Sequence, residues 1–236
     1  MPKGKLFLIP NVLAENTAND VISPQVREVV KHTKVYLVEN LRTARRYISS
    51  LKLGVNIEEI HFEILDKSTK PETINRLMQP LINGADVGII SEAGCPGIAD
   101  PGALAVAHAH VKGIQVVPLS GPSSMFLALM GSGFSGQSFA FHGYLPIDKK
   151  DRASALKALE SESLREKRAQ IFMETPFRNN QIFEDCLRVL SANTKLCIAK
   201  NITAKDEMIL TKTIAEWKKL PLDLHKIPTV YILQSF

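Results

Sequence analysis

The residues best suited to chemistry lie in two glycine-rich segments, each directly after an apolar run. The first, residues 91–102, carries the acids Glu92 and Asp100, the thiol of Cys95 and three glycines. Ligands of open α/β sheets bind at the carboxyl ends of the strands. The segment matches neither GxGxxG nor a Walker A sequence, so nothing in it is arranged to cradle phosphate. An acid directly after a strand suits a ligand with ribose hydroxyls or positive charge. We therefore predict a binding loop from Glu92 to Pro96, whereas Asp100 is expected only to cap the next helix.

The second segment, residues 116–125, ends another apolar run with a Ser-Gly-Pro turn. Ser123 and Ser124 follow the turn and open a predicted helix. Free backbone N–H groups and two hydroxyls at that position could hydrogen-bond a nucleoside. A simple capped helix start accounts for one serine equally well, so this segment alone leaves both interpretations open.

Polar residues follow two later apolar runs as well. Glu174 and Arg178 come after residues 169–173 and could form either an ion pair lining a pocket or a surface pair of little energetic value. Residues 200–207 gather polar groups in a similar way. The chain has no GxSxG elbow and no His, Cys and acidic residues at metal-ligand spacing. Cys95 has no basic neighbour in the sequence, so we expect it to line a site and not to act as a nucleophile.

The elements that position these segments predict an α/β fold. In residues 1–119, short apolar runs alternate with amphipathic helical patterns. The runs are residues 6–9, 35–38, 60–65, 87–90 and 114–119, and the helical patterns are residues 24–33, 42–51, 71–82 and 101–112. Short, continuous apolar runs between helices are typical of parallel strands buried on both faces. We therefore predict an N-terminal domain built on a doubly wound parallel sheet.

Residues 120–236 have a different pattern and predict a second α/β domain with a mixed sheet. Strands are predicted at residues 138–144, 169–173, 196–199, 207–211 and 229–233, and helices at residues 123–130, 152–160 and 180–190. The last strands lie close together in the sequence, which favours antiparallel pairs. No flexible linker separates the halves, and a cleft between two such domains is the default place for a ligand.

Composition and cysteine usage exclude several classes of protein. The 236 residues are 45% hydrophobic and 22% charged, which is typical of a globular chain and not of a disordered or fibrous one. No run approaches the roughly 18 apolar residues of a membrane span. Three cysteines without a CxxC pair indicate neither a disulfide framework nor a zinc site. Pro10 interrupts the first apolar stretch too early for a signal peptide, so we expect a cytoplasmic protein.

The charge is mildly basic and unevenly placed. The net charge is +5, and residues 119–236 carry 16 Lys and Arg against 12 Asp and Glu, compared with 13 against 12 in residues 1–118. The excess around residues 149–168 permits an anionic partner, but its mixed signs also suit a solvated helix face. If the partner is RNA, we expect phosphate contacts from Arg42, Arg45 and Arg46 and from residues 149–152.

Four segments in order carry a family resemblance. Residues 91–102 read SEAGCPGIADPG and resemble SDAGTPxISDPG, and residues 117–124 read VPLSGPSS and resemble VPLPGPSA. Residues 141–146, FHGYLP, and 172–178, FMETPFR, are similar to GFLP and FYES(T/P)HR. The chain thus resembles the tetrapyrrole-methylase superfamily of S-adenosylmethionine-dependent methyltransferases. Within that superfamily it is most similar to the small-subunit ribosomal RNA cytidine 2′-O-methyltransferases.

The resemblance implies a two-domain homodimer that binds S-adenosylmethionine in the interdomain cleft, needs no metal or membrane, and acts on RNA. The residues implied to bind the cofactor are Pro10, Glu92, Gly94, Cys95, Ser123, Ser124, Met173, Ile202 and Thr229. The residues implied to bind the substrate are Arg42, Glu174 and Arg178. Methyl transfer is an in-line displacement, so positioning is expected to supply most of the catalysis, and no general base is assigned.

The sequence departs from the family pattern mainly on the substrate side. Residues 10–16 lack the Ile-Gly of TPIGN, residues 39–43 lack the Asp and His of the acidic-Asp-Thr-Arg-His segment, and residues 200–204 replace Arg-Glu-Leu-Thr-Lys by KNITA. Two alternatives therefore stay open. One is methylation of a small tetrapyrrole, and the other is a cofactor- or RNA-binding protein that no longer catalyses.

Overall fold

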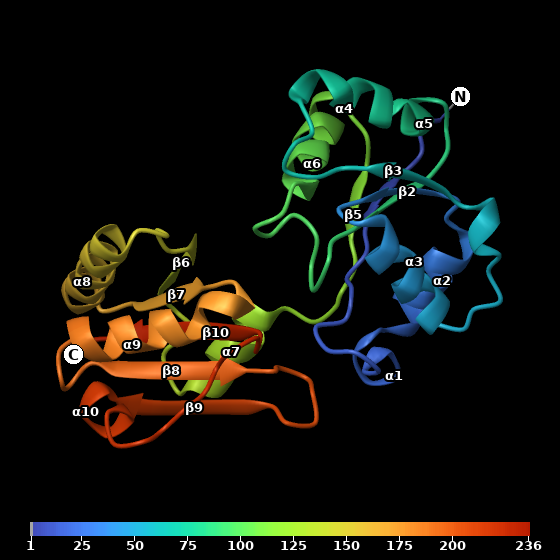
Figure 1. The fold of residues 1–236 in the computed structure, drawn as a ribbon. Helices are drawn as coiled ribbons and strands as arrows, with labels where there is room; N and C mark the ends of the chain where they lie inside the picture. Colours follow the sequence, from blue (N-terminus) through green and yellow to red (C-terminus); the bar gives the residue numbers. More distant parts are fainter. Residues whose placement is uncertain (1) are drawn as a thin grey trace. The chain divides into compact units, whose positions relative to one another are not determined.

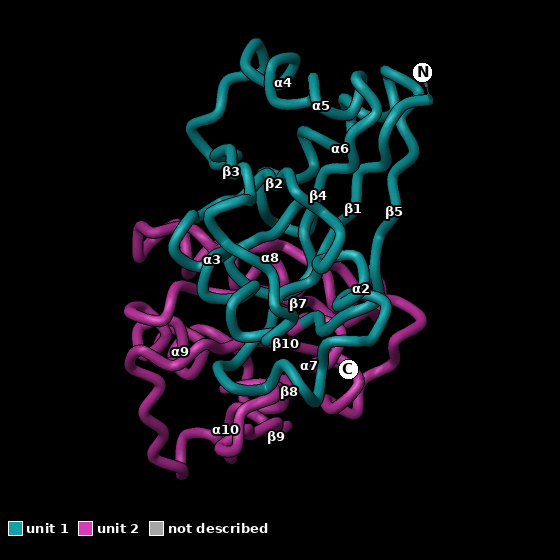
Figure 2. The backbone as a smooth tube through the Cα atoms, turned by 90° about the vertical axis from the view of Figure 1, so that its right-hand side faces the viewer, with its two compact units in different colours: residues 1–123 teal, residues 124–236 magenta. Residues whose placement is uncertain are grey.

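The computed structural model describes residues 2–236 and divides the chain into two compact units (Figure 2). Unit 1 comprises residues 1–123 and unit 2 residues 124–236. The sequence analysis predicted the domain boundary between residues 119 and 120. These residues lie in the turn between the last strand of unit 1 and the first helix of unit 2. Among residues 2–236, no helix combines the length and the apolar character that crossing a membrane requires.

Unit 1 is built on a five-stranded parallel sheet (Figure 1). Its strands are β1 (Leu6–Leu8), β2 (Val35–Val38), β3 (His61–Ile64), β4 (Val87–Ile90) and β5 (Val116–Pro118). They lie in the order β3-β2-β4-β1-β5, and every neighbouring pair is parallel. The parallel sheet predicted from the continuous apolar runs is confirmed.

Helices cover both faces of this sheet. One face holds α2 (Pro24–His32) and α3 (Leu41–Ser50), and the other holds α4 (Pro71–Leu77), α5 (Gln79–Ile82) and α6 (Gly102–Val111). Successive strand residues point to opposite faces, so Tyr36 joins the first core and Leu37 the second. This arrangement confirms the doubly wound interpretation. The predicted helix at residues 71–82 is interrupted at Met78, because Pro80 has no N–H to continue the ladder.

The strand order reverses between β1 and β4. These strands are neighbours, yet the chain leaves β1 through α1 (Ala18–Val21) toward the face of α2, and leaves β4 toward the face of α6. Their following loops therefore diverge at the carboxyl edge of the sheet. Such a reversal is where open α/β sheets bind ligands.

Unit 2 contains a five-stranded mixed sheet. Its strands are β6 (Phe139–Tyr144), β7 (Ala169–Met173), β8 (Lys195–Lys200), β9 (Met208–Thr213) and β10 (Thr229–Gln234). In the order β6-β7-β10-β8-β9, only β6 and β7 pair in parallel. The mixed sheet expected from the closely spaced last strands is confirmed.

The two faces of the second sheet are covered unequally. α8 (Lys149–Glu166), α9 (Asn179–Val189) and α10 (Ile214–Trp217) enclose the main core, where Phe172 stacks on Tyr231 at a ring distance of 5.3 Å. α7 (Ser124–Ser132) lies against the opposite face, on β8, β9 and β10. α8 is twice as long as predicted. Asp148 caps its start by accepting from two backbone N–H groups, and Lys167 ends it in the left-handed conformation.

The short elements α1, α10, η1 (Ile57–Glu59) and η2 (Pro176–Arg178) were not predicted. Each spans three or four residues, about one helical turn. Such a segment has no apolar repeat from which a helix could be recognised.

Candidate functional site

The loops after β1 and β4 are bound to each other at the carboxyl edge of unit 1. The backbone N–H of Asn11 donates to the carbonyl of Gly94 at 2.8 Å. The Asn11 side chain is 2% exposed, and its Nδ2 donates to the carbonyls of Ser91 at 3.1 Å and Glu92 at 2.9 Å. One buried amide therefore fixes the start of the predicted binding loop. The sequence analysis did not single out Asn11, although it lies in the loop after the first strand, three residues beyond Leu8.

The loop after β5 lies on the same two loops. The Cys95 thiol donates to the carbonyls of Gly121 and Pro122, at 3.7 and 3.4 Å. A Cβ atom on Gly121 would lie 2.2 Å from Cβ of Pro10, a distance that real Cβ atoms do not adopt. Only glycine therefore lets the turn after β5 approach the end of β1. The Tyr47 hydroxyl holds this end by donating to the carbonyl of Pro10 at 2.7 Å.

The structure thus brings five of the predicted cofactor residues to one edge of the unit 1 sheet. Pro10 and Gly94 are buried, Cys95 and Ser123 are half-buried, and Glu92 is exposed. Gly94 has a φ of +70°, in the left-handed region that favours glycine. Ser124 begins α7 and belongs to unit 2.

A carboxylate that the sequence analysis did not assign lies beside this loop. Glu39 directly follows β2, and the backbone N–H of Glu92 donates to its Oε2 at 3.4 Å. Burial raises the pKa of Glu39, and the nearby carboxylates of Glu92 and Asp100 raise it further, against the opposing effects of the Glu92 N–H and Lys67. The edge of unit 1 is therefore acidic. The rule that polar residues after parallel strands line a site would have found Glu39.

Asp100 has a structural role that differs in detail from the prediction. Its carboxylate accepts from the backbone N–H of Gly97 at 2.8 Å and from that of Gly102 at 2.7 Å. The residue at the N-cap position of α6 is Pro101. Asp100 therefore closes the loop onto the first residue of the helix and is not itself the N-cap residue.

The environment of Cys95 suits a lining residue. Burial raises the pKa of its thiol, and the Asp100 carboxylate raises it further. Only the thiolate is an effective nucleophile. The expectation that Cys95 lines the site and does not attack a substrate is consistent with this shift.

In unit 2, three predicted cofactor residues lie at one end of the mixed sheet. Met173 ends β7 and lies opposite Val230 of β10, and Thr229 begins β10 opposite Lys200 of β8. Ile202 follows β8, next to a backbone hydrogen bond of 3.0 Å from Asn201 to the carbonyl of Pro228. These residues are neighbours because β7 and β8 end where the antiparallel β10 begins.

Glu174 and Arg178 form a buried ion pair, so the surface alternative is wrong. The Glu174 side chain is fully buried and the Arg178 side chain is 22% exposed. Glu174 also accepts from the backbone N–H of Thr175 at 2.6 Å. Its second oxygen and one Arg178 nitrogen, Nη1, are buried without a hydrogen-bond partner among the described residues. Buried polar atoms are normally hydrogen-bonded. The free Glu174 oxygen and Arg178 nitrogen can therefore bind a water molecule or a polar group of a ligand.

The three arginines proposed as phosphate contacts on α3 have different surroundings. Arg42 is exposed, Arg45 lies 5.7 Å from the centre of the Phe62 ring, and Arg46 pairs with Glu15 at 3.3 Å. All three lie on α3, as the sequence predicted.

The phosphate contact predicted at Arg152 is wrong. Arg152 is 4% exposed, and its guanidinium pairs with Asp185 at 2.6 Å and donates to the carbonyl of Ile147 at 2.7 Å. Position 152 lies on the inner face of α8 together with Leu156 and Leu159. The arginine is therefore a core residue of unit 2.

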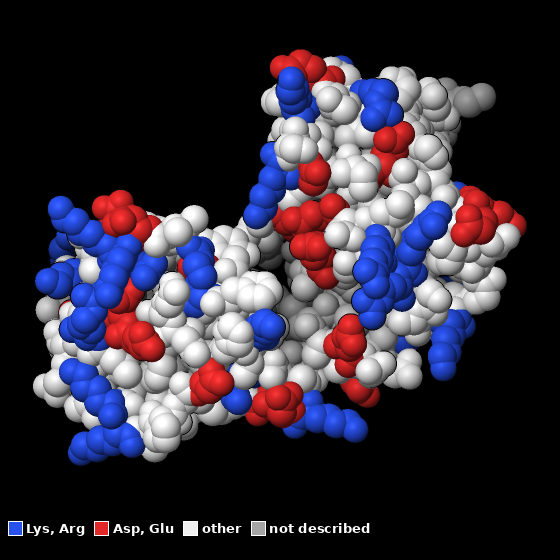
Figure 3. All heavy atoms as spheres, in the orientation of Figure 1, with Lys and Arg blue, Asp and Glu red and all other residues white. Residues whose placement is uncertain are grey.

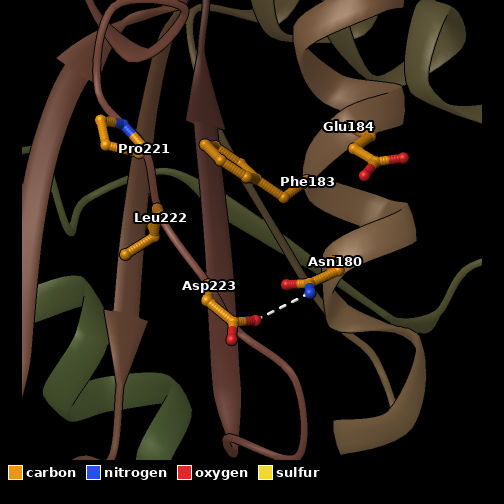
Figure 4. Close-up of a pocket in the computed structure, with 6 residues that line it drawn as sticks. All are labelled: Asn180, Phe183, Glu184, Pro221, Leu222 and Asp223. Atoms are coloured by element: carbon orange, nitrogen blue, oxygen red, sulfur yellow. Dashed lines mark hydrogen bonds between the residues drawn. The ribbon is translucent and has the colours of Figure 1, made fainter.

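A separate hollow of about 670 Å³ lies on unit 2 between α9 and residues 221–223 (Figure 4). It is lined by Asn180, Phe183, Glu184, Pro221, Leu222 and Asp223. Asn180 donates to Asp223 across it at 2.8 Å. It contains none of the residues predicted from the sequence. Within the described part of the chain, no cluster of His, Cys, Asp and Glu could hold a metal ion.

The fold and the loop cluster define a two-unit α/β protein with an acidic group of loops at the carboxyl edge of its parallel sheet. Residues 14–218 match the family described as Tetrapyrrole (Corrin/Porphyrin) Methylases, and the chain belongs to this family. The match covers most of the chain, and the resemblance predicted from four segments is confirmed.

Two curated relatives of this chain share one name, ribosomal RNA small subunit methyltransferase I. "Ribosomal RNA small subunit methyltransferase I" of Buchnera aphidicola is 28% identical over 236 residues, which cover 99% of this chain and 79% of the relative. The protein of that name from Halalkalibacterium halodurans is 30% identical over 214 residues, covering 91% of this chain and 70% of the relative. The predicted enzyme class, an S-adenosylmethionine-dependent methyltransferase, is therefore confirmed.

Solved structures share the fold at low sequence identity. Diphthine synthase is 15% identical with a TM-score of 0.68 and covers 98% of this chain and 89% of its own. The methyltransferase CobJ is 16% identical with a TM-score of 0.65, covering 98% and 94%. A uroporphyrin-III C-methyl transferase from Thermus thermophilus, complexed with S-adenyl homocysteine, is 15% identical with a TM-score of 0.57, covering 98% of each chain.

Proposed function

We propose that this protein transfers a methyl group from S-adenosylmethionine to the ribosomal RNA of the small subunit. By resemblance, the acceptor is the 2′-hydroxyl of a cytidine. The observation that carries the proposal is similarity over nearly the whole chain to relatives named ribosomal RNA small subunit methyltransferase I. The cytoplasm, as the place where ribosomal RNA is modified, belongs to the same proposal.

The loop cluster of unit 1 suits S-adenosylmethionine. This cofactor carries a sulfonium cation, a ribose with two hydroxyls and no phosphate. The exposed carboxylate of Glu92 and the nearby Glu39 supply negative charge and hydrogen-bond acceptors, and Ser123 supplies a hydroxyl. Gly94 and Cys95 complete the surface, held in place by Asn11. The cofactor contacts of Ser124, Met173, Ile202 and Thr229 remain predictions from the resemblance.

Methyl transfer depends mainly on how the protein positions the two reacting groups. When bound, the cofactor supplies an electrophilic methyl group, and the acceptor hydroxyl must approach in line with the bond that breaks. Well-oriented reacting groups remove several kcal/mol of the barrier, of the order of 7–11 in favourable cases. In this chain the hydrogen-bonded loops after β1, β4 and β5 provide a rigid support for such alignment. Arg42, Glu174 and Arg178 remain the predicted substrate contacts.

The first experiment measures binding and transfer on matched variants. Calorimetry with S-adenosylmethionine and S-adenosylhomocysteine compares the wild type with Glu92→Ala, Ser123→Ala and the control Glu72→Ala, an exposed acid on α4. Weaker binding in the first two variants alone supports the cofactor site. Transfer of a labelled methyl group to small-subunit RNA then tests the substrate.

The same assay separates the two alternatives. Methylation of a corrin or porphyrin precursor without RNA affinity would favour the small-molecule reaction, which is the chemistry in the name of the family. Bound cofactor without turnover on any of these substrates would favour a protein that no longer catalyses.

We include a homodimer in the proposal because α7 of unit 2 exposes large apolar side chains. α7 has no charged residue and leaves Phe126 45% and Met130 79% exposed. A helix that is apolar on all sides is normally buried. Light scattering after size exclusion tests this, with Met130→Lys expected to shift a dimer toward the monomer. A monomeric wild type at all concentrations contradicts it.

A further inference from the structure

The outer face of α8 carries a continuous row of cations and hydroxyls. Lys150, Ser154, Lys157, Ser161 and Arg165 follow one another at intervals of three or four residues. Residues at this spacing lie on one side of a helix. The opposite side is buried and consists of Arg152, Leu156, Leu159 and Ser163. The row therefore points away from the core of unit 2, and we call it the α8 row.

The cations of the α8 row are available to a partner. Lys150 and Lys157 are exposed, and their ammonium groups form no hydrogen bond or ion pair with any residue from 2 to 236. Arg165 is exposed as well, and its Nε pairs with the neighbouring Glu166 at 2.7 Å. Lys149 and Lys167 extend the positive charge at the two ends of the helix. Figure 3 shows Lys and Arg side chains gathered over α8.

The acids of α8 lie beside the row and not within it. Asp151, Glu160, Glu162 and Glu166 occupy the flanks. Glu160 accepts from the backbone N–H of Ser191 at 2.7 Å, Glu162 pairs with Arg168, and Glu166 reaches the row only at its end, where it pairs with Arg165. The mixed signs of this stretch in the sequence therefore separate in space. The centre of the exposed face contains donors and no carboxylate.

The helix that carries the row is fixed at several points. The buried Arg152–Asp185 pair joins α8 to α9, and Asp148 caps the start of α8. Near its end, the Ser163 hydroxyl donates to the carbonyl of Arg168 at 2.8 Å and accepts from the backbone N–H of Ser235 at 3.0 Å. A partner therefore meets a rigid platform with little ordering cost for the backbone.

We propose that the α8 row binds the phosphate backbone of the RNA substrate, at a contact separate from the predicted cofactor residues. Lys150 and Lys157 are about 10 Å apart along the helix axis, and Arg165 is about 12 Å beyond Lys157. Lys, Arg and Ser are among the side chains that donate to phosphate oxygens, and such contacts position a nucleic acid without reading its bases. The row contains no aromatic side chain on which a base could stack. This inference rests on the proposed RNA substrate.

The experiment compares two variants of equal charge. In the first, Lys150→Gln, Lys157→Gln and Arg165→Gln remove the cations of the row. In the second, Lys205→Gln, Lys218→Gln and Lys219→Gln remove three exposed cations of unit 2 outside α8. Fluorescence anisotropy with a small-subunit RNA fragment is recorded from 50 to 200 mM salt, together with methyl transfer, cofactor binding and melting temperature.

We expect the α8 variant to bind RNA about tenfold more weakly at low salt and to lose about 2–3 from the slope of log K against log salt, since each phosphate contact contributes about 0.7–0.9. Its KM for RNA should rise while kcat, cofactor affinity and melting temperature stay unchanged. For the control variant, the slope of log K against log salt should differ from that of the wild type by no more than the contribution of about one phosphate contact.

Two results overturn the inference while leaving the proposed function intact. In one, the wild type methylates RNA and the α8 variant keeps the wild-type slope and KM. In the other, both variants lose the same affinity, which makes the effect one of net charge. If the wild type neither methylates nor binds small-subunit RNA, the proposed function itself is wrong.

Discussion

The two units carry opposite charge at the carboxyl edge of the unit 1 sheet and on the outer face of α8. At the carboxyl edge of unit 1, Glu39, Glu92 and Asp100 lie close enough for their carboxylates to influence one another. On unit 2, the outer face of α8 gathers Lys150, Lys157 and Arg165, and the acids of the helix lie on its flanks. The net charge of +5 conceals this contrast. An acidic edge suits a cationic cofactor and a basic helix suits a polyanion, so the division of charge matches the two ligands of an RNA methyltransferase.

The two sheets also collect residues by different geometric rules. In the parallel sheet of unit 1, all carboxyl ends meet at one edge, so the loops at residues 9–13, 91–102 and 119–123 come together although they are far apart in the chain. In the mixed sheet of unit 2, the end of β7 meets the start of β10. The rule that ligand-binding residues follow the carboxyl ends of strands therefore identifies the loops of unit 1. In unit 2 it identifies only the residues after β7 and β8, and not those at the start of β10.

The largest expected effect concerns the core of unit 2. Asp185→Ala leaves Arg152 buried without its charge partner, and breaking a buried pair in this way costs about 3–5 kcal/mol. Urea unfolding followed by Trp217, the single tryptophan, reports on unit 2. Glu184→Ala on the exposed side of α9 serves as the control.

The double variant Arg152→Met, Asp185→Ala sharpens this prediction. It replaces the pair by apolar groups and should recover most of the lost stability. A double variant as unstable as Asp185→Ala alone would mean that packing, and not the unpaired charge, causes the loss.

Acid should weaken the same pair. Burial alone would raise the pKa of Asp185, but the hydrogen bonds from Arg188 and Arg152 outweigh it and hold the pKa below its ordinary value. The stabilisation is therefore complete above the pKa of the unfolded chain, about 3.9, and disappears as the pH falls through the lower value of the folded state. Urea titrations from pH 6 to 2 should show a loss in the wild type that Asp185→Asn lacks.

The next effect concerns the loop contact of unit 1. In Gly121→Ala the added Cβ collides with Pro10, so the turn after β5 must move away from the cofactor loop. We expect S-adenosylmethionine affinity to fall at least about tenfold, equivalent to about 1.4 kcal/mol. Gly136→Ala is the matched control, because its nearest neighbour would be 4.0 Å away. Equal affinity of the two variants would show that the contact does not shape the site.

A smaller effect on stability is expected from Glu39 at the acidic carboxyl edge of unit 1. The raised pKa of Glu39 reflects burial first and the acids Glu92 and Asp100 second, so its charged form opposes folding. Glu39→Gln should therefore stabilise unit 1 at pH 7, and the gain should disappear as the pH falls and the wild-type carboxyl becomes protonated. Tyrosine absorbance during urea unfolding at several pH values measures this. A variant less stable at pH 7 would show that the Glu92 N–H bond matters more than burial.

The smallest effect concerns thiol reactivity. Cys95 is the most exposed of the three cysteines, since Cys186 and Cys197 are buried, and burial and Asp100 raise its pKa. In the native protein one thiol should react slowly with iodoacetamide at pH 8, and Cys95→Ser should abolish that reaction. S-adenosylmethionine should slow it further. Protection would place the cofactor at the β4 loop, and its absence would argue for another location.

Sequence reasoning predicted the alternation of strands and helices and both sheet types, and it singled out the glycine-rich loops that meet at the edge of unit 1. It could do so because the signals are local: apolar runs such as residues 87–90 and glycines such as Gly94 at a φ of +70°. It failed for Arg152, which looked like part of a surface patch. An arginine in a stretch of mixed charge gives no sign of whether it forms a buried ion pair with a distant residue. The partner of Arg152 is Asp185, 33 positions away.

The amino-acid sequence by itself determined the family, the two α/β units and the residue types at the strand ends, because periodicity and short motifs are properties of neighbouring residues. The tertiary structure decided which distant groups meet. It brought Asn11 to Ser91 across 80 positions, placed Gly121 against Pro10, buried the Glu174–Arg178 pair and separated the charges of α8 into an outer cationic row and acidic flanks. These contacts depend on strand order and on which helix face packs inward, and both are set by the burial of the whole core and not by any single segment.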